Sequence, residues 1–214
     1  MSKANRRARM SGQERREQLI EVGRTIFARK GFQATSIEEI AQRARITKPL
    51  IYEHFGGKEG LYAVVVDREV KALLDRITDG LDAEQPRLML EQAALAFLGY
   101  IQDNPEGFRV LVRDSPVTGT AGTLASVIDD VASQVEYILV EEFTKREFDE
   151  RLASLYSRAL VGMTVQVGGW WIDVGKPRIE VVAAHLVNLA WNGLGQLDVA
   201  PGLATIQTRR APKS

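Results

Sequence analysis

Residues 46–60, ITKPLIYEHFGGKEG, contain a very short helical pattern that ends at a Gly-Gly pair and restarts at once. Pro49 is tolerated near the start because the first helical turn has no amide partners to lose. Ile51 and Phe55 stand four residues apart, so they share the inward face of the helix. Gly56 supplies the stop. The stretch predicts a helix of about two turns with one face packed and the other exposed.

The flanking sequence supplies further helices that can brace this one. Residues 13–30 carry apolar side chains at helical spacing and end at Gly31. Thr35 and Glu38 fit a capping box that opens a second short helix, and a tight break at 44–46 precedes the quoted stretch. A long amphipathic helix begins after it. Two short helices joined by a tight turn, with a longer helix on each side, predict a helix-turn-helix.

A helix-turn-helix predicts DNA binding, because a short helix with free outward side chains can enter the major groove. Thr47, expected to cap this helix, and Lys48 can bond base edges or phosphates, and Leu50 can meet a thymine methyl group. Helix N-termini also favour anions such as phosphate. The residues expected to contact DNA are Thr35, Ser36, Arg45, Thr47, Lys48, Pro49, Leu50, Tyr52, His54 and Lys58.

The net charge of zero conceals a strong asymmetry along the chain. Residues 1–58 hold 13 Lys and Arg against 6 Asp and Glu, and residues 59–214 hold 15 against 22. A solvated basic tail would account for the charges of residues 3–9 alone. It would not explain why Arg43 and Arg45 continue the bias inside patterned sequence. The basic head is therefore expected to meet a polyanion.

Residues 31–65, GFQATSIEEIAQRARITKPLIYEHFGGKEGLYAVV, resemble the DNA-binding module of the TetR family of bacterial transcriptional regulators. The family's pattern is matched by Thr47, Lys48, Ile51, Tyr52, His54, Phe55, Lys58, Glu59 and Leu61. Pro49, Leu50 and Glu53 depart from it, which leaves the operator sequence open. The resemblance implies a ligand-responsive repressor that binds a palindromic operator as a homodimer and is released by a small effector.

The rest of the chain reads as helices, without strand alternation or internal repeats. Helical periodicity recurs at 84–103, 105–114, 121–146, 149–173 and 178–197. The expected fold is all-α, with an N-terminal three-helix DNA-binding domain and a C-terminal helical domain for effector binding and dimerisation. The domains are expected at 1–57, where the first residues form an N-terminal arm, and at 58–200. A flexible tail is expected at 201–214.

The last two expected helices are apolar on more than one face. Such a helix must be buried on two sides, which fits either the centre of a monomer or a subunit interface. The family resemblance favours the second, since it implies a dimer built from the last two long helices. The residues expected at the dimer interface are Leu155, Gly162, Val182, Leu186, Leu189, Trp191 and Leu194.

The middle helices carry bulky and lightly polar side chains that could line a ligand cavity. Any one of them could instead be ordinary core. Together they would suit a small hydrophobic or amphipathic effector with a planar or acyl portion, and such a cavity fits the small-molecule binding that the resemblance implies. The expected pocket residues are Phe97, Tyr100, Phe108, Tyr137, Met163, Gln166 and Trp170.

Several functional classes have little support in the sequence. The chain has 214 residues and no cysteine, which excludes disulfides and thiolate chemistry and suits a reducing cytosol. No phosphate loop or paired-histidine metal site is present, so neither an enzyme nor a cofactor is expected. His185, alone on an apolar helix, is expected to be a core residue. No apolar stretch is long enough for a membrane span, and a soluble cytoplasmic protein is expected. An architectural DNA-binding protein without an effector remains the alternative.

Overall fold

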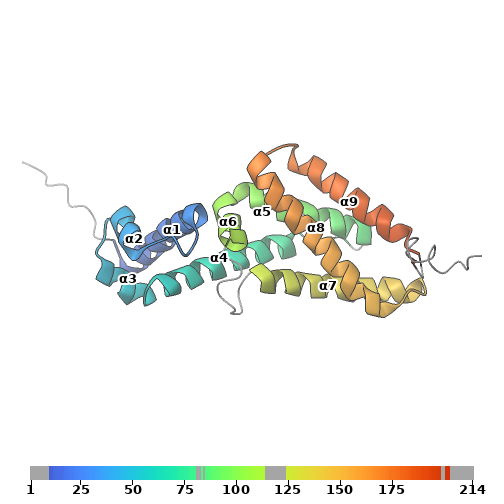
Figure 1. The fold of residues 1–214 in the computed structure, drawn as a ribbon, viewed down its shortest axis with the longest axis horizontal. Helices are drawn as coiled ribbons and strands as arrows, with labels where there is room; N and C mark the ends of the chain where they lie inside the picture. Colours follow the sequence, from blue (N-terminus) through green and yellow to red (C-terminus); the bar gives the residue numbers. More distant parts are fainter. Residues whose placement is uncertain (1–9, 81–82, 84, 114–123, 199–200, 203–214) are drawn as a thin grey trace, which may run out of the picture. The chain divides into compact units, whose positions relative to one another are not determined.

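The chain folds into α-helices throughout the described residues of the computed structural model, which are 10–80, 83, 85–113, 124–198 and 201–202. In these ranges there are nine α-helices, one 3-10 turn and no strand (Figure 1). The helices are α1 (Gly12–Lys30), α2 (Ile37–Ala44), α3 (Lys48–Phe55), α4 (Lys58–Asp79), α5 (Pro86–Asp103), α6 (Pro105–Arg113), α7 (Leu124–Lys145), α8 (Ala153–Val174) and α9 (Ile179–Gly195), and the 3-10 turn is η1 (Glu150–Leu152). The predicted all-α fold is confirmed.

Packing divides the chain into two compact units. The first unit comprises residues 1–79 and 99–127, and the second comprises 80–98 and 128–214. Helices α4 and α6 pack on α1 in the first unit, so this unit extends past residue 57. The functional boundary expected at 57/58 stays a prediction. The tail expected at 201–214 falls almost wholly outside the described residues.

Helix α1 begins with a capping box that the sequence reading missed. Ser11 Oγ accepts a hydrogen bond from the Glu14 amide at 3.1 Å, and Glu14 Oε2 accepts one from the Ser11 amide at 2.7 Å. The two bonds satisfy donors that every helix N-terminus leaves without an intrahelical partner. They set the start of α1 at Gly12, just before the range expected from periodicity.

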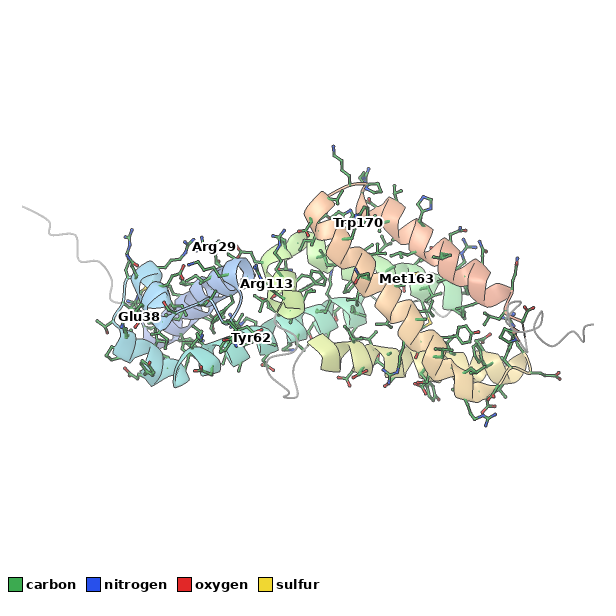
Figure 2. All side chains as sticks on the ribbon, viewed as in Figure 1. Arg29, Glu38, Tyr62, Arg113, Met163 and Trp170 are labelled. Carbon is green, nitrogen blue, oxygen red and sulfur yellow. The ribbon has the colours of Figure 1, made fainter. Side chains whose placement is uncertain are left out.

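An aromatic cluster holds α1, the loop after it and α4 together in the first unit. The rings of Phe27 and Tyr62 meet edge to face with centroids 5.0 Å apart, and Phe32 lies 4.9 Å from Tyr62. Tyr62 is only 3% exposed (Figure 2). Such geometry adds to the hydrophobic gain from burial. The cluster fixes the long helix against the helix that precedes the helix-turn-helix.

Helix α6 is tied to α1 by polar contacts at two points. The Thr25 hydroxyl donates to Glu106 at 3.0 Å. The guanidinium of Arg113 donates to the backbone carbonyls of Ala28 at 3.3 Å and Arg29 at 2.8 Å (Figure 2). A cation at the carbonyl end of a helix satisfies acceptors and complements the helix dipole. Helix α6 thus stabilises the end of α1 from which the chain turns into α2.

The second unit packs α7, α8 and α9 around a core that contains Leu139, Phe143 and Ala153. Arg146 closes the C-terminal end of α9, because its guanidinium donates to the carbonyls of Leu194 at 2.8 Å and Gly195 at 3.0 Å. At the C-terminal end of α8, where the chain turns into α9, Trp171 Nε1 donates to the backbone carbonyl of Pro177 at 2.7 Å. These bonds fix both ends of the α8–α9 pair.

Candidate nucleic-acid interface

A tight left-handed turn at Arg45 joins α2 to α3. Arg45 has φ 56° and ψ 47°, and its amide donates to the carbonyls of Ala41 and Gln42. The next amide, that of Ile46, also donates to Ala41, at 2.9 Å. Left-handed conformations are uncommon outside glycine, so these three bonds to the end of α2 offset a local conformational cost. The turn leaves the Arg45 side chain exposed.

Ser36, rather than Thr35, is the N-cap of α2. Ser36 Oγ accepts from the Glu39 amide at 3.2 Å. Thr35 is only 3% exposed, and its hydroxyl donates to the Gly31 carbonyl at 2.7 Å. The predicted capping box between Thr35 and Glu38 is therefore wrong, because the N-cap residue is Ser36, one position later. The Thr35 hydroxyl serves the α1–α2 loop and does not lie on the surface.

Helix α3 presents one packed face and one open face, as its spacing predicts. Ile51 is 0% exposed and Phe55 9%, whereas Tyr52 is 55% exposed. Thr47 stands at the N-cap but makes no side-chain capping bond there, so its expected capping bond is absent. The exposed residues of this segment are Thr47, Lys48, Pro49, Tyr52 and Glu53, and Leu50 and His54 are half-buried.

An ion pair crosses between the two short helices at this open face. The ammonium group of Lys48, the first residue of α3, contacts Glu38 Oε1 near the start of α2. The hydrogen bond from Lys48 is the main reason that the pKa of the Glu38 carboxyl lies below its usual value. Glu39, the next residue, is paired instead with Lys30 and Arg29 of α1. The two adjacent carboxylates therefore face different helices.

Lys58 stabilises the loop between α1 and α2. Its ammonium donates to the carbonyls of Phe32 at 3.0 Å and Thr35 at 3.1 Å, and it lies 4.2 Å from the centroid of the Phe32 ring. An ammonium has three donors, and two are used in these bonds. The sequence offered no signal for this role, because the acceptors are backbone atoms more than twenty residues away.

The junction between α3 and α4 depends on an unusually close backbone approach at Gly60. A Cβ atom built on Gly60 would lie 1.8 Å from the carbonyl oxygen of Phe55. Only glycine fits such a contact without movement of the backbone. Gly56 (φ +74°) and Gly57 (φ +141°) make the turn itself. Three glycines thus fix where α3 ends and how α4 starts beside it.

The structure brings most of the predicted DNA-contacting residues onto one short exposed segment. Residues 47–50, Tyr52 and His54 lie together on α3 and at its start, with Ser36 and Arg45 exposed at the ends of α2. Thr35 and Lys58 differ, since both engage backbone carbonyls. The open face combines hydroxyl, ammonium and phenol donors with apolar groups, which suits contacts to phosphates and base edges.

Two family models match the chain along both of its parts. "Bacterial regulatory proteins, tetR family" matches residues 19–65, and "Tetracyclin repressor-like, C-terminal domain" matches residues 86–193. The chain belongs to the TetR family of bacterial transcriptional regulators. The first match spans α2 and α3 completely and therefore includes the open face of α3.

Individual transcriptional regulators align with most of the chain. The HTH-type transcriptional activator FasR of Mycolicibacterium smegmatis is 29% identical over 207 residues, 91% of this chain and 90% of that protein. A TetR-like regulator from Rhodococcus sp. RHA1 has a TM-score of 0.75 at 28% identity and covers 87% of this chain and 99% of its own. The fatty acid degradation regulator FadR from Bacillus halodurans has a TM-score of 0.68 at 17% identity, with 84% and 96% covered, and shares the fold alone.

The residues predicted for the TetR-family dimer interface divide between two environments. Leu155 and Leu189 are each 62% exposed and Trp191 is 37% exposed, while Gly162 is exposed with open space where a Cβ would stand. Val182 and Leu186 are buried within the second unit, and Leu194 packs against its core. Three further apolar residues of α8 and α9 are also exposed: Trp170, which was expected in the effector pocket, and Val174 and Val181, which were not among the predicted interface residues. The dimer interface stays a prediction.

The residues predicted for the effector pocket do not share one compact unit. Tyr100 and Phe108 are fully buried in the first unit, where the Tyr100 hydroxyl bonds Glu69. Phe97, Tyr137, Met163, Gln166 and Trp170 belong to the second unit. Phe97 is 6% exposed, whereas Tyr137 is 71% and Trp170 51% exposed. The pocket stays a prediction, and the first two residues have core roles.

Two further observations concern other kinds of site. Within the described ranges no cluster of three or more His, Asp or Glu side chains is arranged to hold a metal ion. Among the same residues, no helix combines the length and the apolar character needed to span a bilayer. His185 is exposed on α9, so the expectation that it is a core residue is wrong.

Proposed function

We propose that this TetR-family protein is a ligand-responsive repressor that binds a palindromic operator as a homodimer and leaves it when a small effector binds. The observation that carries the proposal is the amphipathic character of α3. Ile51 and Phe55 anchor the helix, so its opposite face is held open for the major groove. Because its operator would lie on the bacterial chromosome, the protein would act in the cytoplasm.

Contacts to DNA would come from the exposed residues that begin α3. Lys48 and Thr47 stand where the N-terminus of a recognition helix reaches base edges. Tyr52, further along the open face, would donate to a phosphate oxygen. Thr35 is left out of the direct contacts because it is buried, and Lys58 acts chiefly by holding the α1–α2 loop.

Dimerisation would occur through the exposed apolar face of α8 and α9. Leu155, Leu189 and Trp191 are large apolar side chains that water contacts in the single chain, and burial against a second copy would remove that cost. A dimer also recognises an operator more specifically, because it presents two copies of α3 and one short helix contacts few base pairs. Two copies of α3 must then stand about 34–36 Å apart on half-sites one helical turn apart.

The effector would be a small hydrophobic or amphipathic molecule with an acyl or planar portion. Within the second unit, Phe97, Met163 and Gln166 supply the apolar surface and the polar group such a ligand needs. The effector must bind the DNA-incompetent arrangement more tightly. By linkage, operator DNA must then weaken effector binding by the same factor.

The test is selection of bound sequences from a random DNA pool, followed by gel-shift titration of the selected site with and without fractionated lipophilic metabolites. The expected result is a two-fold symmetric site that is released by one fraction. A site that no fraction releases would support the architectural alternative instead. The M. smegmatis relative is described as an activator, so a reporter gene behind the selected site tests the proposed direction. Repression of the reporter supports the proposed repressor, and activation overturns the direction of regulation that we propose.

A further inference from the structure

The Glu38–Lys48 ion pair places a carboxylate on the surface that is to meet a polyanion. Glu38 has 61% of its side chain exposed and Lys48 has 50%. Exposed pairs of this kind contribute little to folding stability. The pair is therefore expected to affect DNA binding more than folding, because a carboxylate without a cation would repel a nearby phosphate.

The pair also occupies a defined place in the helix-turn-helix. Glu38 is the second residue of α2 and Lys48 the first of α3. In this motif the first helix crosses the phosphate backbone and the N-terminus of the second reaches base edges. Lys48 thus stands between two possible acceptors, a phosphate oxygen and a base edge. The neighbouring Glu39 cannot direct it, because Glu39 is bonded to Lys30 of α1 at 2.8 Å.

An ammonium group has three donors, so one bond to Glu38 leaves two. Guanine presents two acceptors, O6 and N7, in the major groove, and lysine is among the side chains that read them. We propose that Glu38 is a positioning residue that holds the Lys48 ammonium on a guanine edge and keeps it from the phosphates. The proposal rests on the proposed function, in which α3 enters the major groove. Glu38 would then set the base preference at one position of each half-site.

The experiment compares wild type with Glu38→Gln by selection from a random pool and by salt titration on the selected operator. In Glu38→Gln the preference for guanine at one position of each half-site should fall about tenfold, and affinity for random DNA should rise. The salt dependence should steepen by about one ion per half-site, because Lys48 is free to pair with a phosphate. An unchanged base preference would overturn the proposal.

Two matched variants make the result specific. Glu21→Gln removes the same charge from an ion-paired carboxylate of α1, 2.7 Å from Arg24, and should leave the base preference intact. In a Lys48→Ala background, Glu38→Gln should have no further effect on it. An equal loss of preference in Glu21→Gln, or a full additional loss in the Lys48→Ala background, would contradict positioning through Lys48.

The test separates this inference from the proposed function. If wild type selects a two-fold symmetric site and Lys48→Ala weakens binding to it, α3 contacts DNA as proposed. An unaltered base preference in Glu38→Gln then refutes the role of Glu38 alone. If wild type selects no site, or if Lys48→Ala binds as wild type does, the contact of Lys48 with DNA that the proposed function supplies fails and the inference fails with it. Melting temperatures of all variants, expected to match wild type, confirm that the fold is intact.

Discussion

The hydroxyl of Tyr100 lies 2.8 Å from Oε2 of Glu69, a residue that is only 4% exposed. Arg24 Nη1 lies 3.7 Å from the other carboxylate oxygen, so α1 and α5 together compensate a charge buried on α4. Helix α6 closes over it at Gly107, where a Cβ would stand 1.9 Å from the carboxylate. Burial, and then the charge of Glu69, raise the pKa of Tyr100, so its hydroxyl remains a donor.

Loss of this hydroxyl is expected to weaken the first unit. Tyr100→Phe removes a bond to a buried carboxylate and should lower the free energy of unfolding by about 1–3 kcal/mol. Urea denaturation measures the change. Tyr137→Phe is the control, because Tyr137 is 71% exposed and its change should be close to zero. Equal effects of the two substitutions would show that the Glu69 bond is not a stabilising contact.

Gly60→Ala should disrupt the junction between α3 and α4. The new methyl group would meet the Phe55 carbonyl at 1.8 Å, and the backbone shift needed should cost about 1–3 kcal/mol. Gly12→Ala is the matched control, since nothing lies within 4 Å of the added carbon there. It should change stability by less than about 1 kcal/mol, on the favourable side. Thermal melts of both variants provide the comparison, and a Gly60→Ala protein as stable as Gly12→Ala would refute the close approach.

The stability of the first unit should depend on pH through Glu17. Two hydrogen bonds from Arg68, at 2.6 and 2.9 Å, lower the pKa of the Glu17 carboxyl. Because the folded state has the lower pKa, the Glu17–Arg68 pair stabilises the fold above the pKa of the unfolded chain, 4.5. This stabilisation is lost as the pH falls through the pKa of the folded state. Melting temperature should therefore fall more steeply below about pH 5 in wild type than in Glu17→Gln or Arg68→Gln. Parallel curves for all three proteins would exclude the effect.

Most of the fold could be predicted from the sequence because its signals are local. Apolar spacing and glycine stops placed α3 within a residue of its bounds, and Ile51 and Phe55 lie inward as expected. The features that were missed join residues far apart in the chain. The bonds of Lys58 to backbone carbonyls and the burial of Glu69 against α6 depend on tertiary packing, which periodicity does not encode. The capping residue of α2 was placed one position early because Thr and Ser stand side by side here and both are preferred N-cap residues.

The exposed face of α8 and α9 should form the dimer. Leu189→Arg places a charge at a residue that is 62% exposed in the single chain and that would be buried between copies, where an unpaired charge is costly. Light scattering should show monomers or aggregates. Leu88→Arg, at a 43% exposed residue of α5, should leave the dimer intact. A monomeric wild type, or a dimeric Leu189→Arg protein, would remove this interface.

The central claim is that α3 binds the operator through its open face, and equilibrium affinity for the selected operator tests it most directly. Lys48→Ala and Tyr52→Ala each remove an exposed side chain of α3. Lys71→Ala, at a lysine of α4 with 75% of its side chain exposed, removes the same charge elsewhere. We predict that each α3 variant binds about tenfold or more weakly with an unchanged melting temperature, whereas Lys71→Ala binds nearly as wild type does. Wild-type affinity in both α3 variants would contradict the claim.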